Sequence, residues 1–326
     1  MTDVVLNNIV KTYNKGEVKA VNDVSFEVSK GELFGLIGAD GAGKTSIFRI
    51  LTTLLLPDSG TASVNGFDVV KDYKTIRKNV GYMPGKFSLY QDLSVAENLN
   101  FFATVFNTTV AENYDLVKDI YVQLEPFKTR RAGKLSGGMK QKLALCCALI
   151  HRPTVLFLDE PTTGVDVVSR KEFWEMLKGL KQQGITILVS TPYMDEATLC
   201  ERIALIQNGS IMSIDTPDNI IKKFPDTLFA VRADNMGRLQ HTLRNNPQIK
   251  SCFSFGDFHH ITFKESYKPS ENEVIKALQG SKLFEKSSGY PQVAELIQTL
   301  QEANFQDIEI KHITPSIEDC FINLMN

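Results

Sequence analysis

Long apolar runs, CxxC cysteine motifs and an excess of charge of either sign are all missing from this sequence. No apolar segment approaches the roughly 18 residues of a membrane span, and the run at residues 143–150 is far too short. The 5 cysteines are scattered without a CxxC spacing, so neither a disulfide framework nor a metal site of cysteines is expected. The 36 lysines and arginines nearly balance 38 aspartates and glutamates, so no basic field recruits nucleic acid.

What remains is an ordinary globular composition. A length of 326 residues predicts two domains, and a hydrophobic content of 43% is enough for a sizeable core. The N-terminal stretch has neither a basic start nor an apolar core, so a secretory signal is not expected. We therefore expect a cytoplasmic chain that meets a membrane only through a partner.

Residues 1–220 alternate between short apolar runs and helical patterns. Strands with both faces buried are predicted over 32–38, 154–160 and 185–191, and a strand with one buried face is predicted over 21–28. Ile47, Ile50, Leu51 and Leu54 stand at helical spacing and predict a helix over 45–55. Strands that alternate with helices favour an α/β fold with a mostly parallel sheet.

The character of the chain changes near residues 223–228. We place there the boundary between a domain of residues 1–220 and a small α+β domain of residues 221–326. The second part predicts a strand over 227–234, a helix over 236–246, a hairpin that turns at Gly256 and a helix over 270–280. His259 and His260 stand in an alternating strand pattern, and we expect them at the surface or a sheet edge rather than as metal ligands.

The segment GADGAGKT follows a predicted strand and precedes a predicted helix, as the phosphate-binding pattern GxxxxGK[ST] requires. Glycines let the backbone fold tightly with its amides pointing inward, and these amides and the helix N-terminus bind phosphate oxygens. Lys44 then reaches the β- and γ-phosphates of ATP, and Thr45 offers its hydroxyl to Mg²⁺. The predicted nucleotide-binding residues here are Gly38, Ala39, Asp40, Gly41, Ala42, Gly43, Lys44, Thr45 and Ser46.

An acidic pair ends the apolar run LFLDE. Asp159 is predicted to hold Mg²⁺ through water, and Glu160 to act as the general base that polarises the attacking water. An acidic pair after a strand is also a common strand-end cap. Together with the phosphate loop, however, it predicts the second half of an ATP-hydrolysing site and a P-loop NTPase fold.

The segment KLSGGMKQK narrows the class. Leu135, Ser136, Gly137 and Gly138 resemble the signature of ATP-binding-cassette (ABC) ATPases. The resemblance implies an ABC-type core sheet with a helical signature subdomain over about residues 86–150. Cassettes of that family associate head to tail, so the resemblance also implies that this signature closes over ATP held by a second ABC ATPase.

The resemblance extends over residues 1–220 with the motifs in order. Tyr13 resembles the aromatic residue that stacks on adenine, and an ordinary strand-end tyrosine is the alternative. Asp166 resembles the aspartate that contacts the opposite subunit, although Val165 replaces the usual leucine. Residues 81–99 resemble the segment that faces the membrane partner.

Other stretches resemble ATPases of ABC-2-type exporters, especially the first halves of tandem two-cassette multidrug-export ATPases. These stretches are GFDV near Gly66, PYMDEA after Thr191, and TPSIEDCF at residues 314–321. The resemblance implies an energy-coupling ATPase subunit that sits on the cytoplasmic face of the membrane through ABC-2-type permease subunits. A soluble ABC-type ATPase acting on ribosomes or DNA and an ATP-binding regulatory subunit with little hydrolysis remain alternatives.

Two polar residues of the family's site are replaced. Gly85 stands where a glutamine contacts Mg²⁺ and water, and Pro192 stands where a histidine contacts the γ-phosphate. Proline has neither a side-chain donor nor a backbone N–H, and loss of a preorganised donor costs roughly 10²–10³ in rate. We predict that this site binds ATP but hydrolyses it slowly, which favours a heterodimer with a competent cassette. A homodimer in which other groups compensate, for instance Lys86, is the alternative.

Aromatic residues gather in the segment 86–106. The resemblance predicts that one set lines a groove for a cytoplasmic permease helix: Phe87, Leu89 and Tyr90. A second set is expected to pack inside the helical subdomain: Phe101, Phe102, Val105 and Phe106.

Overall fold

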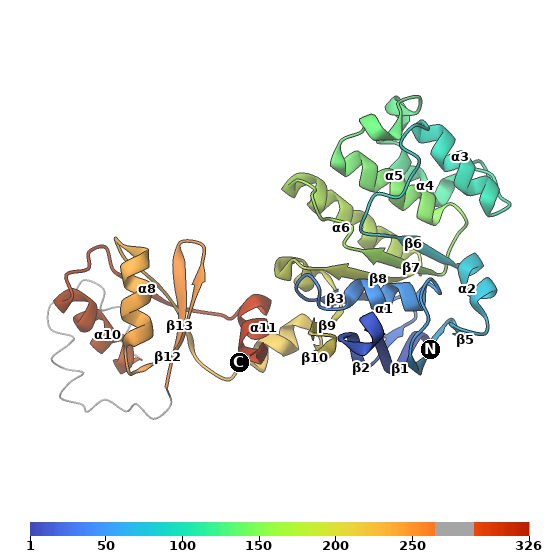
Figure 1. The fold of residues 1–326 in the computed structure, drawn as a ribbon. Helices are drawn as coiled ribbons and strands as arrows, with labels where there is room; N and C mark the ends of the chain where they lie inside the picture. Colours follow the sequence, from blue (N-terminus) through green and yellow to red (C-terminus); the bar gives the residue numbers. More distant parts are fainter. Residues whose placement is uncertain (265–289, 326) are drawn as a thin grey trace. The chain divides into compact units, whose positions relative to one another are not determined.

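The computed structural model describes residues 1–264 and 290–325, which form two compact units (Figure 1). The first unit is built mainly from residues 1–222, and the second follows from Lys223. Within the described ranges, no helix is both long and apolar enough to cross a membrane. The helix predicted over 270–280 lies outside the described residues.

A six-stranded sheet forms the centre of the first unit, in the order β10-β9-β3-β8-β7-β6. Its strands are β3 (Leu33–Ile37), β6 (Val80–Met83), β7 (Val155–Asp159), β8 (Thr186–Thr191), β9 (Arg202–Gln207) and β10 (Ser210–Asp215). All pairs are parallel except β9 with β10. Every residue of β3, β7 and β8 is buried, which confirms the three strands predicted from continuous apolar runs.

A second sheet of the first unit is antiparallel, in the order β2-β1-β4-β5. Its strands are β1 (Thr2–Tyr13), β2 (Val18–Ser29), β4 (Ser59–Val64) and β5 (Phe67–Asp68). The prediction of one buried face over 21–28 is confirmed, because Val24, Phe26 and Val28 are buried while the residues between them are exposed. The mostly parallel pattern therefore holds for only one of the two sheets.

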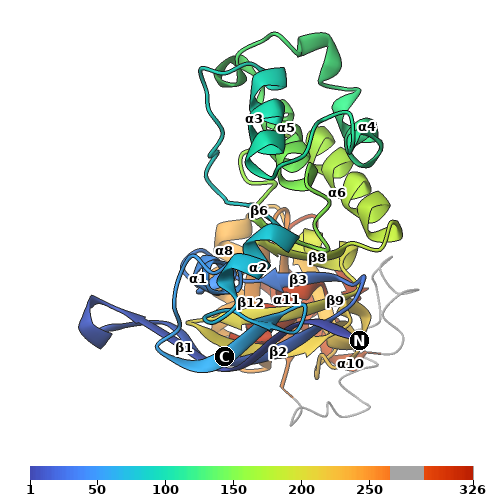
Figure 2. The same cartoon turned by 90° about the vertical axis from the view of Figure 1, so that its right-hand side faces the viewer.

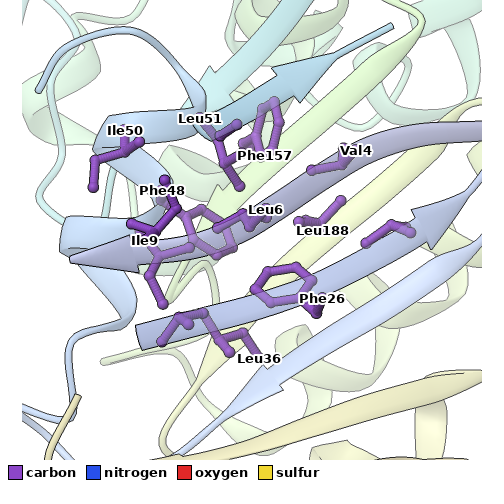
Figure 3. Close-up of a cluster of buried hydrophobic side chains, with 14 of the residues drawn as sticks. Val4, Leu6, Ile9, Phe26, Leu36, Phe48, Ile50, Leu51, Phe157 and Leu188 are labelled. Carbon is purple, nitrogen blue, oxygen red and sulfur yellow. The ribbon is translucent and has the colours of Figure 1, made fainter. Parts of the chain in front are cut away.

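The main core lies between these sheets (Figure 3). Helix α1 (Lys44–Leu51) contributes Ile47, Phe48, Ile50 and Leu51 to it. The predicted helix over 45–55 was too long, because Thr53 adopts a left-handed conformation with φ of 64°. Leu54 is consequently 56% exposed and does not continue the buried face.

Four of the remaining helices lie in the upper part of the first unit (Figure 2), where α5 contacts β6 and α6 contacts β8. These are α3 (Val95–Val105), α4 (Tyr114–Tyr121), α5 (Gly137–Leu149) and α6 (Val167–Gln182). Helix α3 begins with a capping box of Ser94 and Glu97, which satisfies two otherwise unpaired backbone amides. The short helices α2 (Tyr73–Asn79) and α7 (Pro217–Lys222) also belong to the unit.

The second unit is an antiparallel sheet in the order β12-β13-β11-β14. Its elements are β11 (Leu228–Arg232), α8 (Met236–Asn245), β12 (Ile249–Phe255), β13 (Phe258–Phe263), α10 (Pro291–Glu302), β14 (Glu309–Ile313) and α11 (Ile317–Met325). The strand, helix and hairpin predicted before residue 264 are confirmed. Among the described residues the elements follow one another as βαββαβ, which with this strand order is a ferredoxin-like arrangement.

His259 does not lie at the surface, contrary to the sequence prediction. It belongs to the interior strand β13 and is 4% exposed. One ring nitrogen, Nδ1, is 3.0 Å from Ser254 Oγ, and the other, Nε2, is 2.8 Å from the Met236 carbonyl oxygen. The alternating pattern correctly predicted a strand, but a histidine whose two nitrogens both find partners is tolerated on the buried face.

Candidate functional site

The loop between β3 and α1 holds its backbone amides ready for an anion. Gly41 and Gly43 have φ of 79° and 107°, the left-handed region that glycine adopts without strain. Gly43 caps α1 and has no side chain to accept from the first amides of the helix. The amides at the start of α1 therefore have no side-chain acceptor from the capping residue, and phosphate oxygens can accept from them.

Lys44 is the first residue of α1, and its side chain turns back under the loop. It is 3% exposed, and its ammonium donates to the carbonyl oxygens of Gly38 at 2.8 Å and Ala39 at 3.0 Å. The same ammonium lies 3.2 Å from Glu160 Oε1. The fold thus brings the predicted phosphate lysine and the predicted general base together at one sheet edge.

Asp159 ends β7 and is 2% exposed. Its Oδ1 accepts from Ser190 Oγ at 2.7 Å and from Thr45 Oγ1 at 3.3 Å. A hydroxyl and a carboxylate side by side are the oxygen donors that Mg²⁺ prefers, so Thr45 and Asp159 fit that ion. Burial, followed by the negative charge of Asp159, raises the pKa of the nearby Tyr82 to about 12.

Glu160 follows Asp159 in a left-handed conformation with φ of 52°. Its amide donates to both the carbonyl and the hydroxyl oxygen of Ser190, at 3.1 and 3.0 Å. Ser190 therefore forms hydrogen bonds with both acidic residues, to the carboxylate of Asp159 and from the amide of Glu160. Sequence reasoning did not single out Ser190, although a polar residue next to the end of an apolar strand was a usable signal.

Gly85 and Pro192 both lie at this edge. A Cβ on Gly85 would be 3.1 Å from the Asp159 carbonyl oxygen and 3.8 Å from Glu160 Cβ. Pro192 follows Thr191, the last residue of β8, whose carbonyl oxygen accepts from the Gly38 amide at 3.4 Å. A side chain at either position would thus begin close to the acidic pair or the loop.

Tyr13 is the last residue of β1 and is 37% exposed. Its hydroxyl lies 3.1 Å from the hydroxyl of Ser46, in the first turn of α1. The ring therefore stands beside the phosphate loop while part of it remains open to solvent.

The signature residues and Asp166 form a separate group. Ser136 caps α5 and accepts from the Met139 amide at 3.4 Å. A Cβ on Gly138 would lie 2.7 Å from Ser169 Oγ, so α5 and α6 approach each other closely at their starts. Asp166 is exposed and caps α6 through the Ser169 amide at 3.0 Å, a bond that lowers the pKa of its carboxyl.

Comparison with known proteins bears on this arrangement. Residues 21–163 match the family model described as ABC transporter. The chain is 37% identical over 227 residues to the doxorubicin resistance ATP-binding protein DrrA of Mycobacterium tuberculosis, covering 69% of each protein. The chain belongs to the ABC transporter family.

Two further similarities add detail to this ABC cassette. It is 35% identical to the probable multidrug ABC transporter ATP-binding protein YbhF of Escherichia coli over 99% of its own length but 52% of that protein. The chain thus spans about half the length of that relative. A dimeric ATP-binding cassette in a post-hydrolysis state with ADP and phosphate superposes with a TM-score of 0.60 at 25% identity, over 65% of this chain and 98% of the other.

A groove of about 310 Å³ opens between the sheet and the helical part of the cassette. Among its lining residues are Leu54, Tyr82, Leu89, Phe102 and Phe106. Of the residues predicted for such a groove, only Leu89 lines it. Of those predicted to be internal, Phe102 and Phe106 line it.

The prediction that Phe101 and Val105 pack inside the helical subdomain was wrong, while a permease groove at Phe87 and Tyr90 stays a prediction. Phe101 and Val105 are 39% and 56% exposed, because the buried residues of α3 are Val95, Asn98, Leu99 and Ala103 instead. Tyr90 is half exposed and packs edge-to-face on Phe101 with ring centres 4.8 Å apart. Helix α3 turns Phe101 and Val105 outward, which the number of aromatic residues in the segment did not reveal.

Proposed function

We propose that this chain is the ATP-binding, energy-coupling subunit of an ABC-type exporter. The observation that carries the proposal is the convergence of Lys44, Asp159 and Glu160 at the end of the parallel sheet. In this proposal Lys44 binds the β- and γ-phosphates, and the loop amides bind the remaining phosphate oxygens. Thr45 and Asp159 hold Mg²⁺, which when bound neutralises phosphate charge. Glu160 accepts a proton from the attacking water.

The chain's own site is proposed to hydrolyse ATP slowly. No side chain extends from Gly85 toward the acidic pair, and Pro192 offers no donor at the end of β8. The contacts proposed to bind ATP do not depend on either position. Binding is therefore retained, while loss of the two donors lowers the rate of hydrolysis by roughly 10²–10³ for each donor.

A second cassette is proposed to complete the assembly. Gly138 of the signature lies against Ser169, whose amide Asp166 caps, so these motifs form a group of their own at the starts of α5 and α6, which supports a role on ATP bound elsewhere. A dimer of two unequal cassettes uses this signature with a better-equipped site, and we favour it over a homodimer. The relatives' names support export of drug-like compounds.

ATP turnover of the purified chain tests the slow site. Calorimetry should show Mg²⁺-dependent ATP binding, while steady-state turnover of the unmodified chain should stay low. The variant Gly85→Gln/Pro192→His should turn over ATP at least ~10-fold faster, as expected for restored donors. Adding Glu160→Gln should abolish this gain. Brisk turnover by the unmodified chain would refute the slow-site proposal.

The groove beside α3 supports a permease of ABC-2 type as partner, which would hold the chain at the cytoplasmic face of the membrane. Its walls are largely apolar, as expected for a site that receives one face of a helix. Leu54→Glu places a charge in the groove, whereas Val122→Glu changes a similarly exposed residue that does not line it. Copurification of permease subunits from solubilised membranes should be lost only for Leu54→Glu. Equal recovery with both variants would refute this docking site.

A further inference from the structure

Glu196 is a buried carboxylate that the proposed chemistry does not use. It lies four residues after Pro192 in the short helix η4 (Met194–Leu199), and its side chain is 2% exposed. We propose that Glu196 is a positioning residue for ATP hydrolysis, which fixes the end of β8 against the catalytic pair and the start of α6. The inference rests on the proposed function, in which the end of β8 faces the γ-phosphate.

One carboxylate oxygen of Glu196 joins two segments of the catalytic edge. Oε2 accepts from Thr191 Oγ1 at 2.5 Å and from Thr162 Oγ1 at 3.0 Å. Thr191 directly precedes Pro192, and Thr162 comes two residues after Glu160. Both threonines are buried, so water does not compete for these bonds. A single oxygen therefore sets the spacing between the turn at Pro192 and the turn that carries the general base.

The second oxygen of Glu196 reaches α6. Arg170 Nε and Nη2 both lie 3.0 Å from Oε1, so the guanidinium fork holds the carboxylate from two atoms. The guanidinium also lies 4.2 Å from the centre of the Tyr193 ring, the residue after Pro192. The turn at Pro192 is thus clamped from α6 by both a charge and a ring contact.

Arg170 stands one turn after Asp166 and next to Ser169, which approaches Gly138 of the signature helix. A continuous set of contacts therefore runs from Gly138 through Ser169, Arg170 and Glu196 to Thr191. A buried ion pair is a poor device for stability, because apolar residues of similar volume often serve as well. Its value here is geometric: it fixes the hydrolytic edge relative to the signature without contacting the residues proposed to bind phosphate.

Glu196→Gln tests this role, with Glu175→Gln as the matched control. Glu175 is an exposed residue further along α6, and its salt bridge is to Lys178 of the same helix. Both variants should be measured in the Gly85→Gln/Pro192→His background, where turnover is easiest to follow. Glu196→Gln should lower kcat by about 10- to 100-fold, the size expected for a small displacement of reacting groups. The Kd for MgATP should stay near that of the control, while the melting temperature should fall, because Arg170 loses its buried partner.

A second variant guards against simple misfolding. Arg170→Met/Glu196→Gln removes both charges and leaves no unpaired charge buried. It should stay folded and bind ATP, yet still show the reduced kcat. A kcat of the double variant equal to that of the control would overturn the positioning role. A parallel loss of kcat, ATP affinity and melting temperature in both variants would also overturn it.

A failure of the Glu196 inference can be distinguished from a failure of the proposed function. If the unmodified chain already turns over ATP briskly, the slow-site proposal fails. The Glu196 inference is then decided by kcat in the unmodified chain, with the same expected decrease and the same control.

Discussion

Lys44 Nζ lies 3.2 Å from Glu160 Oε1, so the residue proposed to bind phosphate faces the residue proposed to accept the proton. Lys44 is almost fully buried, whereas the side chain of Glu160 is 23% exposed. The pair can therefore separate on the side of Glu160 when a phosphate group competes for the ammonium. We therefore expect Lys44 to contribute strongly to ATP affinity in the proposed site.

Lys44→Met should weaken ATP binding while the fold persists. A hydrogen bond to a charged group contributes about 1.5–3 kcal/mol, which corresponds to roughly a 10- to 100-fold rise in Kd. Titration calorimetry with MgATP measures this change. Lys178→Met, which removes an ammonium that is 44% exposed, is the control and should leave Kd unchanged. An unchanged Kd for Lys44→Met would remove the phosphate role from this residue.

Tyr13 offers a test between adenine stacking and an ordinary strand-end tyrosine. Tyr13→Phe keeps the ring and loses only the contact to Ser46, so the Kd for ATP should hardly change. Tyr13→Ala removes the ring, and the loss of about 1 kcal/mol of aromatic contact should raise Kd roughly fivefold. Equal affinity in the two variants would favour the strand-end interpretation.

Substitution of Gly138 should create a packing defect, and substitution of Gly179 serves as its control. A Cβ there would lie 2.7 Å from Ser169 Oγ and 2.8 Å from Ser169 Cβ, so Gly138→Ala should destabilise the chain by about 1–3 kcal/mol. Gly179→Ala has no atom within 4 Å of the new Cβ and should be stabilising, because alanine favours a helix interior. Urea unfolding compares the midpoints. Ser169→Gly should recover part of the loss in Gly138→Ala, and a failure to do so would place the strain elsewhere.

The sequence predicted which segments meet at the end of the parallel sheet, because the signals for these segments are local. The phosphate loop and the buried strands β3, β7 and β8 each occupy a few consecutive residues with a fixed order of glycine, apolar and acidic side chains. Their meeting point then follows from parallel strands ending at one edge. The prediction of the small α+β unit also rested on local alternation and turn residues.

What the sequence did not predict depends on contacts between distant residues. The carboxylate of Glu196 joins Thr162 and Arg170, which are 34 and 26 residues away, and no local pattern marks such a set. The exposure of Leu54 follows from one left-handed residue, Thr53, that ends α1 early. The surface position predicted for His259 was wrong. Alternation of apolar and polar residues predicts a strand, but it does not show that a histidine ring with hydrogen-bond partners can lie on the buried face.

The carboxyl of Asp58, close to Tyr13 in the fold, should make the stability of the folded chain depend on pH. Its carboxylate accepts from Lys11 Nζ at 2.6 Å, and from the amide and hydroxyl of Thr12 at 2.7 and 2.8 Å. The bond from Lys11, then those from Thr12, lower the pKa of Asp58 from 3.8 to about 2. These bonds join the end of β1, which carries Tyr13, to the segment before β4.

A folded-state pKa below the unfolded value means that the ionised carboxylate favours the folded chain. The contribution should be complete above pH 3.8 and should disappear as the pH falls through about 2. Asp58→Asn should therefore lower the urea midpoint at pH 7 and match the unmodified chain near pH 2. Because the side chain of Asp58 is 37% exposed, added salt should shrink the difference at pH 7. A difference that stays constant from pH 7 to pH 2 would mean that the amide disrupts the turn by shape alone.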